Sequence, residues 1–396
     1  MAQFIASVVT ILVVFGVSLT GVAYCILLER KIAAWTQDRI GPNRVGFSFG
    51  LEFMPKFHFW GLGQPLADGL KFLLKEDFTP QNVDRGLFML APVLAIVPAL
   101  LGWVVIPWGG QLQWGDRVLS IAGAPIDIGV VYILAVGSVA VYGVIVGGYA
   151  SNNKYSFLGG MRATAQMLSY EIPLGLSVLT MILLSGTARA DGIVNLQAGG
   201  GWNIIRMPLL AVIFFICNLA ETNRAPFDLA EAEQELVGGY HTEYSSMKFA
   251  LFFLAEYAHM ITAAAFFSVL FLGGWSLNPF GRPDLPLVGG LGAVLLKFAV
   301  FGLKIFFYLA LMMMVRWTLP RLRFDQLMRL AWRGLIPLAL ALLVLAAVKE
   351  YLGGAGWLLL VGNLGLAAGA LALLARRTGG GKSIHRLTPM NADATA

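Results

Sequence analysis

Ionisable side chains recur inside stretches of the sequence that are otherwise apolar. Glu171 lies in QMLSYEIPLGL, Glu221 closes FFICNLAET, and Glu256 lies in ALFFLAEYAHM. Lys297 and Lys304 share the stretch GAVLLKFAVFGLKIFFYL. A charge at the centre of a membrane helix costs roughly 2.5–3.5 kcal/mol on insertion scales, so each is a functional candidate. Acids and lysines in separate helices favour a buried ion path. Snorkelling near a helix end, above all for Glu221, and structural ion pairs are the alternatives.

A second group of acids lies in the segment 223–246, NRAPFDLAEAEQELVGGYHTEYSS, which holds a single base, Arg224. Its acids are Asp228, Glu231, Glu233, Glu235 and Glu243. Pro226 suits the first turn of a short helix, on which Asp228, Glu231 and Glu235 would share one face. Carboxylates crowded in a partly desolvated place cannot all ionise, so some retain protons. The spacing therefore favours a proton relay, with a solvated acidic surface as the alternative.

The composition shows which elements must position these groups. Of the 396 residues 58% are hydrophobic and 13% charged, whereas soluble domains are roughly 25% charged. Runs long enough to cross a membrane as helices recur along the chain. We therefore predict an all-α integral membrane protein of one domain with nine transmembrane helices. The predicted spans are 4–28, 87–108, 126–149, 166–186, 206–222, 247–273, 294–316, 334–352 and 356–375.

Lysine and arginine counts in the connections predict the orientation. The segment 29–86, the connection before the eighth span and the C-terminal tail are basic, and the alternate connections hold few bases. The N-terminus is thus expected in the periplasm and the C-terminus in the cytoplasm of a bacterial inner (plasma) membrane. Residues 64–77 are too short and charged to span, and their leucines share one face, which predicts an amphipathic helix at the membrane surface. The tail 378–396 is expected to be disordered.

The sequence predicts no metal site and no nucleotide site in this chain. Cys25 and Cys217 lie far apart at apolar positions, and the four histidines show no ligand spacing with them. The glycine-rich stretches at 289–292 and 379–383 lack the full nucleotide-binding patterns and their strand–helix setting.

Five segments together resemble the H subunit (NuoH) of proton-pumping NADH:quinone oxidoreductase, respiratory complex I, called ND-one in mitochondria. They are LLERKIAAWTQDRIGPNRVG at 27–46, QPLADGLKFLLKE at 64–76, MRATAQMLSYEIPL at 161–174, AETNRAPFDLAEAEQELVGGYHTEYSSMKFALFFLAEY at 220–257 and RWTLPRLRFDQLMRLAWRGLIPL at 316–338. They cover every predicted cytoplasmic connection. The third and fourth are long and specific.

The resemblance implies that the chain closes a quinone chamber with soluble iron–sulfur subunits and binds no cofactor itself. FMN and iron–sulfur clusters would belong to partner subunits, other membrane-arm subunits would be neighbours, and ubiquinone is the favoured substrate. The residues that match quinone-lining positions are Glu29, Arg30, Arg39, Asp68, Arg224, Phe253 and Glu256. Those that match the family's chain of acids, the E-channel, are Glu171, Glu221, Asp228, Glu231, Glu233, Glu235 and Glu243. Lys304 matches a lysine of the seventh span on the proton path, and Lys297 matches no family position.

The chain departs from the family pattern at two places. Residues 47–65, FSFGLEFMPKFHFWGLGQP, replace a shorter link with an aromatic insertion (47–62), expected at the membrane surface beside the quinone entrance. The span 356–375 is a ninth where the family core has eight. The rival interpretations are the homologous subunit of a membrane-bound hydrogenase and, from a different class, a stand-alone cation/proton antiporter. The isolated chain is expected to have no NADH oxidation activity.

Overall fold

The computed structural model describes residues 2–46, 59–229, 236–281, 286, 288–353 and 356–379. In the described part, seven helical segments have the length and hydropathy to cross a membrane. They are α1 (Ala2–Thr36), α3 (Arg85–Val105), α4 (Gly129–Ala150), α5 (Lys154–Ser185), α10 (Ser246–Phe271), α11 (Leu291–Thr318) and the run Phe324–Leu352, which holds α12 (Phe324–Leu330), a π-helical turn and α13 (Ile336–Leu352). Two further apolar helices, α8 (Pro208–Glu221) and α14 (Trp357–Gly379), occupy the fifth and ninth predicted spans. An all-helical membrane protein is therefore confirmed.

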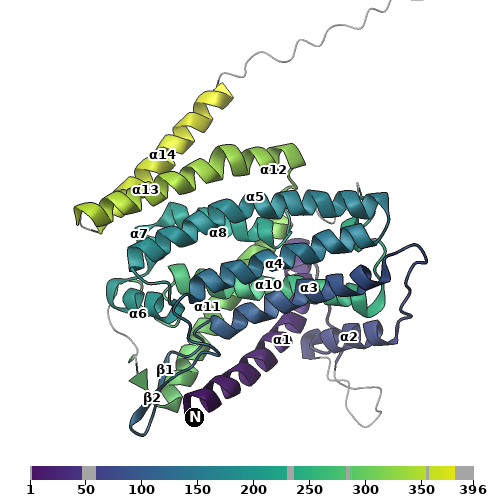
Figure 1. Cartoon of the computed structure of the whole chain (residues 1–396), viewed down its shortest axis with the longest axis horizontal. Helices are drawn as coiled ribbons and strands as arrows, with labels where there is room; N and C mark the ends of the chain where they lie inside the picture. The colour runs from purple at the N-terminus through teal and green to yellow at the C-terminus, as the bar shows by residue number, and fades with distance from the viewer. Residues whose placement is uncertain are drawn as a thin grey trace, which may run out of the picture.

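The long helices lie side by side, with α10 between α3, α8 and α11 (Figure 1). In an apolar stretch of 18 residues taken from each helix, 61% of the residues of α10 are buried. The corresponding share is 28% for α1 and 28% for the run that holds α13. The more buried helix carries small and aromatic residues along its second half, AAAFFSVLF. The central position of α10 explains why a charge on it must find its partner within the protein.

Close contacts between helices depend on glycine. A Cβ added to Gly143 of α4 would lie 2.7 Å from the backbone nitrogen of Ala95 in α3. A Cβ added to Gly148 would lie 2.9 Å from the carbonyl oxygen of Ser156 and 3.2 Å from Cα of Gly160 in α5. Small residues let membrane helices approach until their backbones touch. These contacts set the distances between α3, α4 and α5.

One end of the bundle holds a small sheet and two short helices that the sequence did not predict. Strands β1 (Gln111–Trp114) and β2 (Arg117–Ser120) form a hairpin, and β3 (Val288–Gly289) pairs with β1 in parallel, in the order β2-β1-β3. Gly115, at φ +60°, is the first of two turn residues, where hairpin geometry requires a positive φ. Strands of four residues or fewer carry too little alternation to predict. Helices α6 (Ala190–Gly200) and α7 (Asn203–Arg206) lie at the same end.

The opposite end carries α2 (Gln64–Leu74), which occupies most of the segment predicted as an amphipathic helix. Ser246 at the start of α10 donates a hydrogen bond to the carbonyl oxygens of Phe72 and Lys75, each at 2.9 Å, so α2 is tied to α10. Residues 47–58 of the aromatic insertion and 380–396 of the tail lie outside the described residues. We call this the α2 end and the other the β-sheet end.

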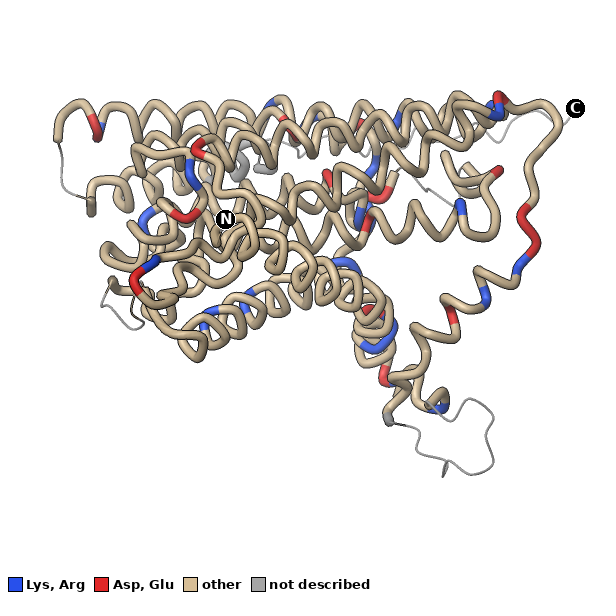
Figure 2. Tube along the Cα trace, turned by 60° about the horizontal axis from the view of Figure 1, so that its bottom comes forward, with Lys and Arg blue, Asp and Glu red and all other residues tan. Residues whose placement is uncertain are grey.

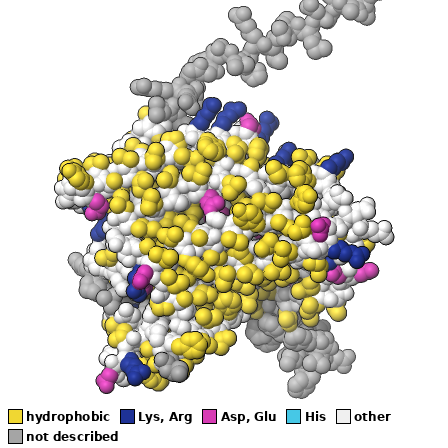
Figure 3. Space-filling model, in the orientation of Figure 1, with side chains coloured by type: hydrophobic (Ala, Val, Ile, Leu, Met, Phe, Trp, Pro, Cys, Tyr) yellow, Lys and Arg dark blue, Asp and Glu magenta, His cyan; other side chains and the backbone are white. Residues whose placement is uncertain are grey.

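The outer surface has the polarity expected of a membrane protein. Figure 3 shows a face that is mostly hydrophobic, with charged side chains mainly near its edges. Most charged residues lie toward the two ends of the bundle, with few between them (Figure 2). Because the exposed apolar residues are large ones such as Leu12, Leu101 and Val344, this surface suits lipid rather than water.

Candidate functional site

Arg224 enters the bundle because the chain reverses directly after α8. Asn223 adopts φ +49°, a left-handed conformation that asparagine tolerates, and the Arg224 amide donates to the carbonyl oxygen of Leu219 at 3.2 Å. The guanidinium then lies 4.3 Å from the centre of the Tyr257 ring. Only 5% of the Arg224 side chain is exposed. Such a buried charge requires opposite charges nearby.

Glu29 and Glu256 supply those charges. Arg224 Nη1 donates to Glu29 Oε2 at 3.4 Å, and its Nη2 lies 3.6 Å from Glu256 Oε2. The hydroxyl of Tyr257 donates to Glu29 at 2.6 Å, and that of Tyr240 donates to Glu256 at 3.1 Å. Arg316, at the end of α11, also donates to Glu29. We call Glu29, Arg224, Glu256 and Arg316, with the two tyrosines, the buried charge cluster.

A cavity of about 600 Å³ opens beside this cluster, between α1, α2, α10 and α11. Its charged lining consists of Glu29, Arg30, Arg39, Asp68, Lys71 and Arg316. Its apolar lining includes Phe72, Phe249, Phe253 and Trp317. Arg30 pairs with Asp68 at 2.9 Å, which joins α1 to α2 across the cavity. This charged cavity brings together five of the seven residues predicted to meet the quinone, and the other two, Arg224 and Glu256, lie in the adjoining cluster.

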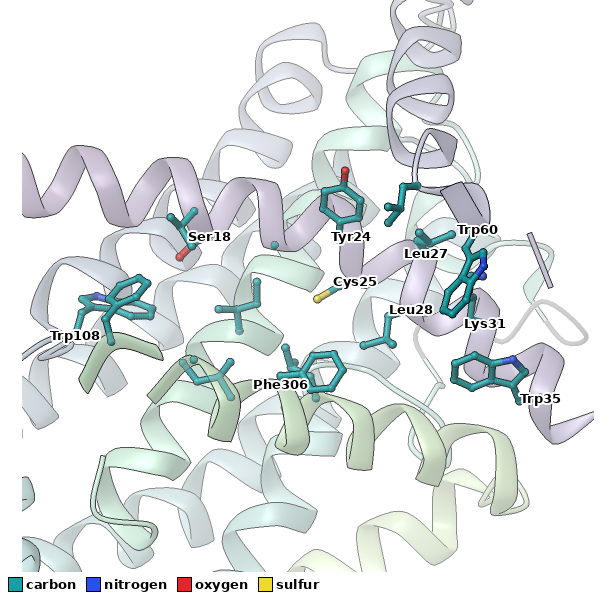
Figure 4. Close-up of a pocket in the computed structure, with 18 of the residues that line it drawn as sticks. Ser18, Tyr24, Cys25, Leu27, Leu28, Lys31, Trp35, Trp60, Trp108 and Phe306 are labelled. Carbon is teal, nitrogen blue, oxygen red and sulfur yellow. The ribbon is translucent and has the colours of Figure 1, made fainter. Parts of the chain in front are cut away.

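A larger cavity, of about 1010 Å³, lies on another face of α1, against α11 (Figure 4). Trp35 and Trp60 stand at one end and Trp108 at the other, with Cys25 and Phe306 between them. Among the described residues that line it, Lys31 carries the charge and none is acidic. Because the described lining of this apolar cavity holds neither a carboxylate nor a histidine, the charged cavity is the stronger candidate site.

Glu171 of α5 and Glu221 of α8 are both approached by α4. Ser138 of α4 donates a hydrogen bond to Glu171 of α5. Glu221 Oε1 lies 3.3 Å from His259 Nε2 of α10, and both side chains are about 15% exposed. A Cβ on Gly137 would lie 3.5 Å from Glu221 Oε1, so α4 also approaches the second acid. Each intramembrane acid therefore has a polar partner on a neighbouring helix, Ser138 for Glu171 and His259 for Glu221.

The acidic segment after α8 does not begin with the predicted helix. Residues 226–229 form turns, so that prediction is wrong for the described residues. The reason is tertiary: Gln166 donates to the carbonyl oxygen of Phe227 at 2.7 Å, and Arg321 holds Asp228 at 2.8 Å. Glu243 accepts a hydrogen bond from Asn153 at 2.6 Å. Glu231, Glu233 and Glu235 lie outside the described residues.

The two intramembrane lysines lie apart from these acids. Lys304 donates to the carbonyl oxygens of Leu272 at 2.6 Å and Gly274 at 2.8 Å, just beyond the end of α10. The ammonium thus satisfies carbonyls that the helix end leaves unpaired. Lys297 is completely buried, with its Nζ 5.7 Å from the centre of the Trp275 ring.

Sequence reasoning did not single out Arg316, Arg321, Tyr240, Tyr257 or His259. Arg316 and Arg321 lie in a connection where lysine and arginine are expected for topological reasons. Their presence in the sequence therefore did not point to a functional site. Tyr257 and His259 closely follow Glu256 in the sequence. That proximity to a buried acid was the available signal.

His241 is buried among aromatic rings in the connection between α8 and α10. The ring centres of Tyr240 and Phe252 lie 3.7 Å and 5.4 Å from its own, and Nε2 has no hydrogen-bond partner among the described residues. Burial lowers the pKa of His241 from 6.5 to about 3. The imidazole is therefore neutral at pH 7.

We expect acid to loosen this connection. In the unfolded connection His241 takes up a proton below about pH 6.5, whereas in the folded connection it does so only near its lowered pKa of about 3. The folded connection is therefore most stable above pH 6.5 and loses stability as the pH falls below that value. The loss at pH 5 is about 2 kcal/mol. Amide hydrogen exchange over residues 239–245, corrected for intrinsic rates, should rise more between pH 7 and pH 5 in the wild type than in His241→Phe. An equal response in both proteins would contradict this account.

The described architecture defines a multi-pass membrane protein with a charged cavity at one end and acids buried between its helices. The NADH dehydrogenase family model matches residues 9–347. The chain is 47% identical over 332 residues to the NADH-quinone oxidoreductase H subunit of Flavobacterium johnsoniae, which covers 84% of this chain and 91% of that protein. It is 44% identical over 363 residues to the H subunit of Leptospira biflexa (88% and 96% covered) and 48% identical over 358 residues to the second H subunit of Koribacter versatilis (87% and 96%).

The chain belongs to the family of the H subunit of NADH-quinone oxidoreductase, a membrane component of respiratory complex I. The resemblance seen in the sequence is thereby confirmed, and membership implies other complex I subunits as partners.

Proposed function

We propose that this chain forms the membrane wall of the quinone chamber and couples quinone reduction to proton translocation through its buried acids. The charged cavity is the observation that carries the proposal, because a quinone needs aromatic and apolar contact for its ring and tail and polar groups at its oxygens. Charged and apolar residues together line one space of about 600 Å³. The soluble iron–sulfur subunits would close this space from the α2 end.

The proton path would lead from the buried charge cluster to the intramembrane acids. Glu256 belongs to the cluster, Glu221 lies on α8, and Glu171 lies on α5. Asp228 and Glu243, with the acids at 231, 233 and 235, would supply protons from the connection after α8. Lys304 would be the positive charge at the far end of the path.

Filling the charged cavity tests the chamber. Ala33 of α1 lines it, and Ala33→Trp should lower the kcat/KM for quinone roughly tenfold or more, since small displacements of a bound substrate reduce rates strongly. NADH oxidation by a water-soluble artificial acceptor should stay unchanged. Val13→Trp, on the outward face of α1 where Val13 is 51% exposed, is the matched control. Normal quinone kinetics in an assembled Ala33→Trp complex would place the quinone elsewhere.

We also propose that α8 and α14 span the membrane, which gives nine spans with a periplasmic N-terminus and a cytoplasmic C-terminus. Arginine and lysine gather at the α2 end and in the connections that meet there. They are Arg30, Lys31, Arg39, Arg44, Lys71, Lys75, Arg85, Lys154, Lys248, Arg316, Arg321, Arg323, Arg329 and Arg333. Among the described residues, the β-sheet end has Arg117, Arg189, Arg206 and Lys349 in its connections and helix ends, and Lys297 and Lys304 of α11 inside the bundle nearby. The α2 end therefore suits the cytoplasm.

Fusions at the C-terminus test the span count. Alkaline phosphatase fused after Ala396 should be inactive, and a fluorescent protein at the same position should fluoresce. A fusion in the connection between α13 and α14 should give the opposite result. Active phosphatase after Ala396 would leave an even number of spans.

A further inference from the structure

We propose that His259 carries protons between the buried charge cluster and Glu221, as a member of the proton path. The inference rests on the proposed function, and it adds a titratable group that is not a carboxylate. Its place in the fold is the middle of α10, between the cluster residue Glu256 and the acid that closes α8.

The contacts of His259 connect two otherwise separate acids. Its Nε2 lies 3.3 Å from Glu221 Oε1. Glu256 stands one helical turn earlier on α10, where residues three apart are neighbours on one face. Glu256 in turn belongs to the buried charge cluster through Arg224, at 3.6 Å. His259 thus lies one helical turn after Glu256 on α10 and contacts Glu221 of α8.

A small cavity adjoins the pair. Its lining includes Glu221, His259, Asn218, Thr262 and Gly137, and its volume of about 20 Å³ admits a single water molecule. A buried water needs two to four polar partners, which these carboxylate, imidazole, amide and hydroxyl groups can supply. The contributions of α3, α4 and α5 to the cavity lining are uncharged: Pro98, Gly102, Ile133, Leu134, Gly137 and Leu174.

From Glu221 the proposed path would continue past Gly137 of α4 toward Glu171. A Cβ at this position would lie 3.5 Å from Glu221 Oε1 and 3.8 Å from His259 Cε1. The following residue, Ser138, donates its hydroxyl to Glu171. Water in the small cavity would therefore lie beside Gly137, the residue that precedes the serine bonded to Glu171.

Imidazole chemistry suits this position. A proton taken up from the side of Glu256 converts the ring to imidazolium, and the proton on Nε2 passes to Glu221 Oε1. The products are neutral imidazole and a protonated carboxyl group, so the step balances without a further reactant. A histidine can accept a proton at one nitrogen and release one from the other, which an amide side chain cannot do.

His259→Asn tests the inference, because asparagine keeps an N–H donor toward Glu221 but carries no titratable proton. In complexes with normal artificial-acceptor activity, quinone-linked NADH oxidation and proton pumping should fall together, by roughly tenfold or more. Positioned proton-transfer groups contribute roughly 10²–10⁴-fold to their own step, and other steps share control of turnover. The remaining rate should show a larger ratio between H₂O and D₂O than the wild type, which a purely structural role would not produce. Ser268→Ala, which removes a buried hydroxyl of α10 that bonds to Ala264 of its own helix outside the small cavity, is the control and should keep most of the rate.

Glu221→Gln separates failure of the inference from failure of the proposed path. An inactive Glu221→Gln beside a normal His259→Asn would overturn the role of His259 and leave the path standing. Normal activity in both would overturn the role of His259 together with this branch of the path. An equal loss in Ser268→Ala would also overturn the assignment to His259. If His259→Asn fails to assemble, Gly137→Ala decides: its methyl group fits at ordinary contact distances and would displace the water, so a slowed enzyme supports the inference and a wild-type rate overturns it.

Discussion

Arg224→Met is expected to abolish quinone-linked NADH oxidation and to destabilise the α2 end of the bundle by about 3–5 kcal/mol. Arg224 lies within 3.4 Å of Glu29 and 3.6 Å of Glu256. Methionine has a similar length but no charge, so Glu256 would lose its counter-charge while remaining buried. Breaking a buried pair from one side leaves an uncompensated charge, whose desolvation is no longer offset.

The measurement combines thermal dissociation of the purified complex with both activities, quinone-linked and artificial-acceptor. Arg329→Met removes an exposed arginine paired with Asp325, 68% and 59% exposed, and should change neither property. The double variant Arg224→Met/Glu256→Gln should recover part of the stability, because the unpaired carboxylate is gone, but not the quinone activity. A single Arg224→Met variant with wild-type stability would show that the cluster is solvated in the assembled complex.

Glu171→Gln is expected to reduce quinone reduction and proton pumping together, by about 10²-fold. Glutamine keeps the shape of the side chain and an oxygen that can accept from Ser138, but it removes the titratable proton. If Glu171 relays protons, a tightly coupled cycle cannot finish with that step blocked, so electron transfer must slow as well. The effect on stability should be small because the hydrogen bond to Ser138 is retained.

Glu350→Gln provides the control for Glu171→Gln. Glu350 lies at the β-sheet end, where it pairs with Lys349 at 2.5 Å and is 39% exposed. Proton uptake and NADH oxidation are compared in membranes whose artificial-acceptor activity shows equal assembly. A Glu171→Gln complex that pumps and turns over normally would exclude this residue from the path.

The features that could be predicted from the sequence are those that depend on the polarity of whole segments, above all the positions of the long helices. Each predicted span coincides with a helix, since about 20 apolar residues leave the chain no other way to pair its backbone in lipid. Glu29, Asp68 and Phe253 could be placed together because they lie in segments that resemble one family.

What the sequence could not predict depends on contacts between segments far apart in the chain. A helix was expected to begin at Pro226, but residues 226–229 form turns. The hydrogen bonds from Gln166 to Phe227 and from Arg321 to Asp228 fix this backbone, and they outweigh the local preference for a helix. Arg316 contacts Glu29 across 287 positions, and spacing within one segment cannot show such a partner. The β1–β2 hairpin is too short for its alternation to stand out.

The formal charges of the buried charge cluster balance when both of its carboxylates are ionised. Glu29 and Glu256 contribute two negative charges, and Arg224 and Arg316 contribute two positive ones. Any single proton added to either carboxylate leaves one positive charge in excess, in a place where an uncompensated charge is strongly disfavoured. A negative charge arriving in the neighbouring cavity would restore the balance. Under the proposed function, a negative charge that forms on the quinone in this cavity would be accompanied by uptake of a proton at the cluster.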